Sequence, residues 1–147
     1  DHLVNRAAMA NVFPDSGSVL EKVELQPGLT KEIVRRGEAS GASPTVGAEV
    51  RCHYTGKLLT GEQFDSSRSR GKPFVFKIGV GMVIRGWDVG IASMLPGERA
   101  ILTCSPDFGY GAAGAGGVIP PNATLAFDVE LLAPGAGGGS SSWCTIA

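Results

Sequence analysis

The chain has 147 residues, of which 43% are hydrophobic and 18% are charged, and this length predicts a single domain with one core. Its 13 basic and 14 acidic residues give a formal net charge of −1, so a nucleic acid is not an expected partner. The sequence has no run of roughly 18 apolar residues, which excludes a transmembrane helix. Two histidines and three cysteines without zinc-motif spacing predict no metal site and no cofactor.

The chain divides by composition into three parts. Residues 1–27 have weak periodicity and are expected to form a flexible leader, in which residues 1–8, preceding Met9, are interpreted as a cloning remnant. Residues 28–133 hold most of the aromatic side chains and are expected to form the folded domain. Residues 134–147 are rich in glycine and serine and are expected to form a flexible tail. The leader lacks the apolar core of a signal peptide, which favours a cytoplasmic protein.

The first element in chain order is ambiguous. Residues 18–25 fit a short helix, with Ser18 as the N-cap and Glu21 three positions later, and fit an unstructured stretch equally well. Residues 29–35 favour a strand over a helix, because they contain the β-branched pair Ile33 and Val34.

Four further segments show the alternation of half-buried strands. In residues 49–56, Val50, Cys52 and Tyr54 fall on one face and polar residues fall between them. The same period of two predicts strands over residues 74–78, 99–105 and 124–132.

Residues 85–94 carry the one helical pattern of the middle segment. Trp87, Ile91 and Met94 are spaced i, i+4 and i+7, which places them on one face of a helix that Pro96 and Gly97 follow. Several short strands around one short helix, without βαβ alternation, predict the α+β class. We expect a curved antiparallel β-sheet wrapped around this helix, with Trp87 buried among the aromatic side chains of the strands.

The sequence lacks the arrangements that covalent catalysis requires. No G-x-S-x-G motif occurs, and the G-V-G of residues 79–81 does not begin a phosphate-binding loop. Cys52 and Cys104 fall on predicted inward faces and are interpreted as core residues, whereas His53 is interpreted as a surface residue or a local hydrogen-bonding partner. Asp65 fits an ordinary Asx-turn. The aromatic residues are core residues by default, but they are numerous enough for some to line a cavity.

Several short motifs occur in one order along about 105 residues. They are V-R-C-H-Y-T-G at 50–56, F-D-S-S-R at 64–68, K-P-F at 72–74, V-I-R-G-W at 83–87, S-P-D-F-G-Y-G at 105–111, V-I-P-P at 118–121 and A-T-L-A-F-D-V-E-L-L at 123–132. In this order and spacing the chain resembles the FKBP family of peptidyl-prolyl cis–trans isomerases. That resemblance implies the same curved sheet and short helix.

The resemblance also implies a proline-binding pocket. It assigns the catalytic positions to Tyr54, Phe64, Asp65, Phe74, Ile84, Trp87, Tyr110 and Phe127, and the surrounding ligand-binding positions to Arg70, Met82, Val83 and Ile119. In the family pattern, Trp87 is the floor beneath the proline ring. The N–H of Ile84 and the hydroxyl of Tyr110 are the donors to substrate carbonyls, and Arg70 supports Asp65 and Tyr54.

The resemblance implies a monomeric isomerase that acts on proline-containing peptides and proteins and binds the macrolides tacrolimus and rapamycin. Two alternatives stay open. The pocket could serve as a binding module for proline segments or for a macrolide-dependent partner, with little catalysis, or the chain could share only the fold and have a blocked pocket. A proline isomerisation assay with and without macrolide separates these functions.

The last residues add a separate motif. Cys144, followed by Thr145, Ile146 and Ala147, forms a C-a-a-X pattern of the farnesyl type after a glycine- and serine-rich lead-in. It predicts prenylation of Cys144 and contact with membranes. No basic cluster precedes the motif, and the alternative is an unmodified tail that occurs by chance.

Overall fold

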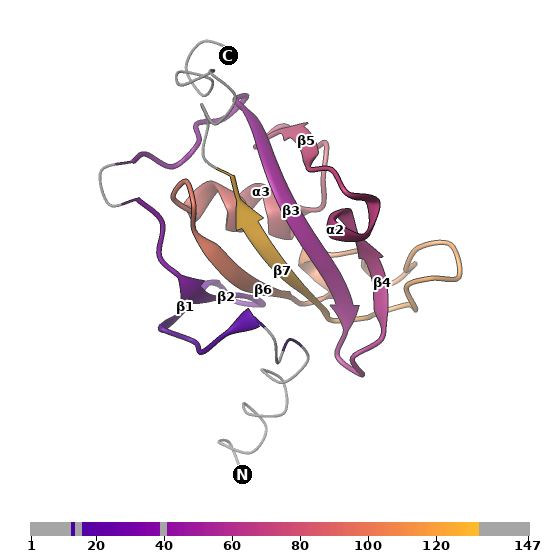
Figure 1. Ribbon diagram of the computed structural model, residues 1–147. Coiled ribbons are helices and arrows are strands. Elements are labelled where there is room, and N and C mark those ends of the chain that lie inside the picture. The colour runs from indigo at the N-terminus through magenta and orange to yellow at the C-terminus, as the bar shows by residue number, and fades with distance from the viewer. Residues whose placement is uncertain (1–12, 14–15, 39–40, 133–147) are drawn as a thin grey trace.

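The computed structural model describes residue 13 and residues 16–38 and 41–132. In this part of the chain a seven-stranded antiparallel sheet curves around one short helix (Figure 1). The strands are β1 (Glu21–Gln26), β2 (Leu29–Arg35), β3 (Glu49–Leu58), β4 (Gln63–Ser66), β5 (Phe74–Lys77), β6 (Arg99–Cys104) and β7 (Leu125–Leu131). Their order in the sheet is β1-β2-β6-β7-β3-β4, and β5 pairs with β3. The predicted α+β fold is confirmed.

The helical elements are short. They are the single turn α2 (Ser67–Arg70), the helix α3 (Arg85–Gly90) and the 3₁₀ turns η2 (Ile91–Ser93) and η3 (Pro106–Phe108). The helix predicted over residues 85–94 is therefore α3 continued by η2, and Trp87, Ile91 and Met94 are all buried, as their spacing predicts.

The strand predictions are confirmed for β2, β3, β5, β6 and β7. On β3 the predicted inward residues Val50 and Cys52 have no exposed surface, whereas Arg51 between them is exposed. Inward-facing side chains from these strands pack against Trp87 and Ile91 and form the main core.

The helical interpretation of residues 18–25 is wrong. Residues Glu21–Gln26 form β1, whose Glu21 is opposite Ile33 of β2, and the N–H of Leu20 already donates to the Ile33 carbonyl at 2.7 Å. Backbone pairing with β2 satisfies more donors and acceptors than one capped helical turn would, so tertiary structure overrides the local capping signal.

The described residues before position 28 pack on the domain, contrary to the expected flexible leader. Phe13 is only 5% exposed and lies against Val34, Ile101 and Ala126 on the outer face of the sheet. The Lys57 ammonium lies 4.9 Å from the centre of the Phe13 ring, at cation–π distance. The folded structure thus extends to the N-terminal side of the predicted boundary at residue 28. Residues 1–8 and 134–147 lie outside the described residues.

Candidate active site

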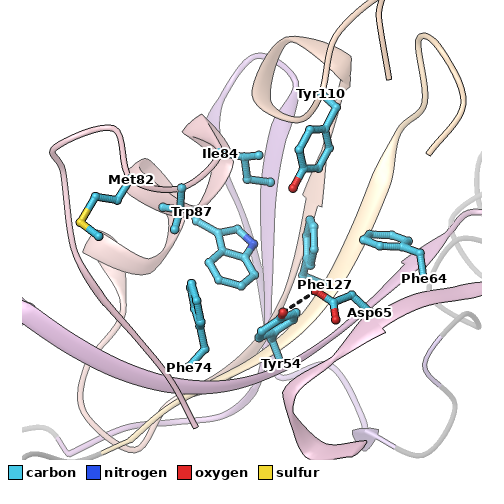
Figure 2. Close-up of a pocket in the computed structure, with 10 residues that line it drawn as sticks. Tyr54, Phe64, Asp65, Phe74, Met82, Ile84, Trp87, Tyr110 and Phe127 are labelled. Atoms are coloured by element: carbon cyan, nitrogen blue, oxygen red, sulfur yellow. Dashed lines mark hydrogen bonds between the residues drawn. The ribbon is translucent and has the colours of Figure 1, made fainter. Parts of the chain in front are cut away.

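A pocket of about 270 Å³ opens on the concave side of the sheet (Figure 2). The residues that line it are Tyr54, Phe64, Asp65, Phe74, Met82, Val83, Ile84, Trp87, Tyr110 and Phe127. They come from β3, β4, β5, the loop before α3, α3 itself, the segment after η3, and β7. Residues far apart in the sequence therefore converge on one mostly aromatic cavity.

Trp87 lies at the centre of the aromatic set and is 5% exposed. Its ring meets Tyr54 edge-to-face with centroids 4.7 Å apart and Phe127 with centroids 5.3 Å apart. Such arrangements match the positive edge of one ring to the negative face of the next. Within the described residues the buried Trp87 Nε1 has no hydrogen-bond acceptor, so the indole is held by ring packing.

Two glycines let α3 approach the sheet closely enough to place Trp87. A Cβ on Gly86 would lie 2.4 Å from the sulfur of Cys104, and one on Gly90 would lie 2.9 Å from a methyl group of Leu102. Larger residues at either position would push α3 away from β6, and the floor of the pocket would move with it.

Asp65 and Tyr54 form the polar wall of the pocket, and Arg70 supports both from behind. The Tyr54 hydroxyl donates to Asp65 Oδ2, as the dashed line in Figure 2 marks. Arg70 donates through Nη1 to Asp65 Oδ1 at 2.7 Å and through Nη2 to the Tyr54 oxygen at 3.0 Å. The backbone N–H of Ser66 donates to Asp65 Oδ1 at 2.9 Å. Both carboxylate oxygens of Asp65 are therefore hydrogen-bonded.

This arrangement changes the acidity of both pocket groups. Partial burial acts to raise the pKa of Asp65, but the hydrogen bonds from Tyr54 and Arg70 outweigh it and hold the pKa below the ordinary value. Burial, followed by the hydrogen bond to Asp65, raises the pKa of Tyr54 to about 12. Asp65 is therefore ionised and Tyr54 is protonated at neutral pH.

The rim of the pocket is more open. Met82 is 61% exposed and Tyr110 is 42% exposed, and Figure 2 shows the Tyr110 hydroxyl directed into the cavity. Burial, together with the charge of Asp65, raises the pKa of Tyr110. Ile84 caps α3, and within the described residues its own N–H has no hydrogen-bond partner. The rim thus presents the Tyr110 hydroxyl to a bound molecule.

Most of the residues that the resemblance assigns to the pocket come together, and two take other places. Arg70 does not line the cavity but contacts Asp65 and Tyr54 from behind. Ile119 is not among the lining residues; it is 6% exposed and belongs to the core. Cys144 lies outside the described residues.

Comparison with known proteins identifies the family of this chain. The sequence profile of the family described as FKBP-type peptidyl-prolyl cis-trans isomerase matches residues 41–132. The chain belongs to this family. FK506-binding protein 1 of Dictyostelium discoideum is 60% identical over 101 residues, which cover 69% of this chain and 94% of that protein. Peptidyl-prolyl cis-trans isomerase FKBP1A of Xenopus laevis is 56% identical over 105 residues, which cover 71% of this chain and 96% of that protein.

The solved structures agree with the sequence relatives. The crystal structure of AtFKBP13 superposes with a TM-score of 0.69 at 40% sequence identity, covering 76% of this chain and 97% of that one. The match spans nearly the whole of each relative, so the activity of the family extends to this chain, which is a peptidyl-prolyl cis–trans isomerase.

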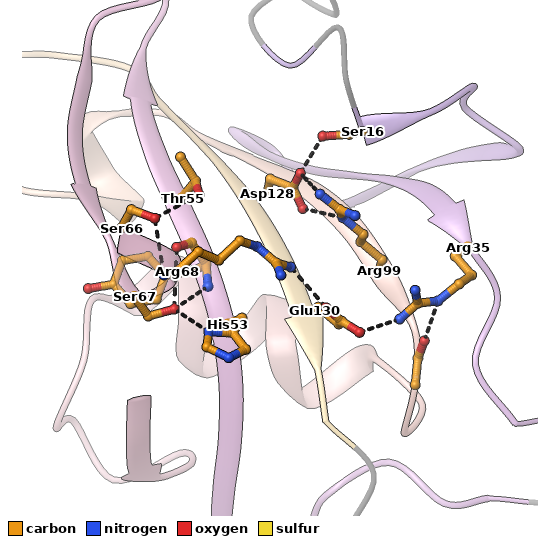
Figure 3. A network of polar contacts seen from close by, with 12 residues as sticks. Ser16, Arg35, His53, Thr55, Ser66, Ser67, Arg68, Arg99, Asp128 and Glu130 are labelled. Atoms are coloured by element: carbon orange, nitrogen blue, oxygen red, sulfur yellow. Dashed lines mark hydrogen bonds and ion pairs between the residues drawn. The ribbon is translucent and has the colours of Figure 1, made fainter. Parts of the chain in front are cut away.

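Sequence reasoning missed Ser67 of this FKBP domain. Its side chain is fully buried, and its oxygen accepts from the backbone N–H of Tyr54 at 2.8 Å and lies 2.9 Å from His53 Nδ1 (Figure 3). Ser66 beside it caps α2 by accepting from the N–H groups of Arg68 and Ser69. The S-S pair after Asp65 was the available signal, because serine is a preferred N-cap. His53 is thus a local hydrogen-bonding partner, one of its two expected roles.

Proposed function

We propose that the pocket holds the proline ring of a substrate against Trp87 and accelerates rotation about the preceding imide bond. The observation that supports this most strongly is a mostly aromatic cavity whose one carboxylate, Asp65, is already hydrogen-bonded through both oxygens. Such a site suits a reaction that requires no proton transfer.

Proline isomerisation is a reaction of that kind. The barrier of about 18–20 kcal/mol comes from the partial double bond between carbon and nitrogen, which is lost as the imide twists. The planar imide is dipolar and well solvated, whereas the twisted imide is less polar. An apolar pocket that excludes water therefore favours the twisted state over the planar one. Lowering the barrier by about 5 kcal/mol would accelerate rotation roughly 10³–10⁴-fold.

The polar groups then have holding roles. The Ile84 N–H and the Tyr110 hydroxyl donate to substrate carbonyls on either side of the twisting bond, so that only the imide rotates. Asp65 supplies a fixed negative charge on the wall beside Phe64, and Arg70 keeps Asp65 ionised and oriented. Pre-organised groups of this kind cost no rearrangement during the reaction.

The same pocket is proposed to bind macrolides of the tacrolimus and rapamycin type. FK506-binding protein 1 of Dictyostelium discoideum, 60% identical over 101 residues, is named for binding FK506. A macrolide ring that fills the aromatic cavity would exclude substrate. We therefore expect it to inhibit turnover competitively.

The test is an isomerisation assay on a short proline peptide, with and without macrolide. Accelerated isomerisation that tacrolimus abolishes is the expected result. Tight macrolide binding with negligible acceleration would favour the alternative, a binding module for proline segments. Absence of both would contradict the assignment of this pocket.

Membrane attachment through Cys144 stays a prediction from the C-a-a-X pattern. Within the described residues no helix is long and apolar enough to cross a bilayer. A single prenyl chain gives only marginal, reversible binding. Fractionation of eukaryotic cells that express wild type or Cys144→Ser, together with intact mass, decides the matter: equal distribution with no mass shift on the wild type would contradict it.

A further inference from the structure

Asp88 follows Trp87 on α3, and its side chain is hydrogen-bonded to the loop of residues 78–84 that precedes the helix. Its Oδ1 accepts from the backbone N–H of Gly79 at 2.8 Å, and its Oδ2 accepts from that of Gly81 at 3.0 Å. Both glycines have φ of 80°, in the left-handed region that glycine adopts without strain. One carboxylate thus binds two alternate N–H groups of a tight loop.

This loop runs directly into the rim of the pocket. After Gly81 come Met82, Val83 and Ile84, all of which line the cavity. The Ile84 carbonyl accepts from the N–H groups of Trp87 and Asp88 at 3.0 and 3.2 Å. The far end of the loop is therefore held by the backbone of α3.

The buried side chain of Ile78 anchors the start of the loop in the core, but side-chain packing contributes little to holding the residues that follow it. Val80 is 51% exposed and Met82 is 61% exposed, so neither side chain is anchored in the core. Two hydrogen bonds to Asp88 then tie Gly79 and Gly81 directly to the helix. Charge-assisted hydrogen bonds such as these are stronger than neutral ones.

We propose that Asp88 is a positioning residue of the isomerase site, which fixes the rim over the Trp87 floor through Gly79 and Gly81. Asp88 is not among the lining residues, so it acts through the loop rather than on the substrate. Because the loop is fixed, the backbone N–H of Ile84 keeps one position relative to the Trp87 indole, from which it can donate to a substrate carbonyl. The proposal rests on the pocket role proposed above.

The test compares Asp88→Asn with wild type. The asparagine keeps one acceptor oxygen, but its NH₂ group faces the second glycine N–H, so one hydrogen bond is lost. We expect amide hydrogen exchange at Gly79 and Gly81 to quicken about tenfold, and KM for a proline peptide to rise roughly three- to tenfold, as the loss of one charge-assisted bond implies. The kcat is expected to stay within about twofold, because the held carbonyl is bound similarly in the ground and twisted states.

Two further variants keep the proposal falsifiable. Glu62→Gln removes one charge from the exposed β3–β4 turn and is expected to change neither exchange nor KM. Asp88→Glu keeps the carboxylate but displaces it, and an intermediate KM is expected. If circular dichroism shows that Asp88→Asn does not fold, Asp88→Glu serves as the test variant in its place.

Several outcomes would overturn the proposal. Unchanged exchange at both glycines would show that the carboxylate does not hold the loop. Faster exchange with unchanged KM, or a fall in kcat alone, would show that the loop does not position substrate. Trp87→Leu is the reference: if it too leaves KM unchanged, the pocket assignment fails, whereas an effect of Trp87→Leu without one of Asp88→Asn contradicts only the role of Asp88.

Discussion

Arg70 and Asp65 are joined by a hydrogen bond of 2.7 Å across the single turn of α2. The turn begins at the cap Ser66 and ends at Gly71, whose φ of 77° is left-handed, and this geometry brings Arg70 back over the strand that carries Asp65. The two side chains are half exposed, so the ion pair orients Asp65 more than it stabilises the fold. It holds Asp65 as an ionised acceptor on the pocket wall rather than as a proton carrier.

Removing single polar groups from the wall or the rim should therefore lower turnover without abolishing it. For Asp65→Ala and Tyr110→Phe we expect kcat/KM to fall between a few-fold and about tenfold, because one good hydrogen bond is worth about 0.5–1.5 kcal/mol. Thermal unfolding should change little, since neither substitution removes core volume. Asp107→Ala, at an exposed aspartate on η3, is the matched control. Complete loss of activity with native stability would instead indicate obligate acid–base chemistry.

The lowered pKa of Asp65 sets the pH range in which its contacts matter. The unfolded chain titrates near the ordinary aspartate value of about 3.9, above the folded value. The stabilisation by the ionised form is therefore complete above that pH and is lost as the pH falls through the folded pKa. We expect the difference in stability between wild type and Asp65→Asn to be constant from about pH 5 to 8 and to shrink below about pH 4.

Chemical denaturation of both proteins at several pH values measures this difference. Glu130 also has a lowered pKa: burial acts to raise it, but the hydrogen bonds from Arg35 and Arg68 outweigh the effect of burial (Figure 3). Because Glu130 titrates in both proteins, its contribution cancels in the difference. A stability difference that persists unchanged to about pH 2 would contradict the structure around Asp65.

A buried ion pair offers a second test of stability. Lys31 on β2 and Glu98 just before β6 are 2.9 Å apart, with side chains only 6% and 5% exposed. Lys31→Met would leave the Glu98 charge buried without its partner, so we expect a loss of roughly 3–5 kcal/mol in the free energy of unfolding. Arg36→Met, which breaks the exposed pair with Glu21, should cost less than about 1 kcal/mol in the same urea titration. Equal effects of the two substitutions would contradict the burial of Lys31.

Phe13 tests whether the N-terminal segment belongs to the domain. Its ring covers Ile101 and Ala126 on the outer face of the sheet, so Phe13→Ala should lower the free energy of unfolding by about 1–3 kcal/mol. We place the loss below that of a central core residue because the segment can detach locally. Val19→Ala, at a side chain 39% exposed, is the control. No loss of stability for Phe13→Ala would show that the packing seen here contributes nothing.

The alternation of side chains predicted the interior of the sheet because burial itself alternates there. In β3, positions 50, 52 and 54 are buried and the positions between them are not. β1 gave no such signal: it has no fully buried residue and is held at the edge of the sheet by its backbone pairing with β2. β4 has only four residues, too few for a period to show. Pattern analysis detects strands that contribute to the core and misses those that contribute mainly hydrogen bonds.

The functional site, like the sheet, could be predicted only in part from the sequence. Helical spacing alone placed Trp87 inside the aromatic set, but the convergence of Tyr54, Asp65 and Arg70 came only from the family resemblance. Asp88 gave no signal, because its partners are backbone N–H groups whose positions depend on the loop. Ile119 was assigned to the rim, yet its loop turns it inward through an isolated bridge with Ala115.

Trp87 provides the most direct test of the pocket. Its indole contacts Tyr54, Phe74, Phe76 and Phe127, so Trp87→Leu removes the floor and several ring contacts together. We expect kcat/KM and macrolide affinity each to fall by more than about tenfold, since losing a large buried aromatic contact in a pocket costs more than about 1.4 kcal/mol. In the wild type, macrolide binding should quench or shift tryptophan fluorescence, and Trp87→Leu should abolish that change although Trp143 remains. Val75→Ala, on the outward side of β5 and 43% exposed, is the control for strand substitutions near the site. If Trp87→Leu stays folded and retains both wild-type activity and the fluorescence response, the proline ring does not bind on this indole.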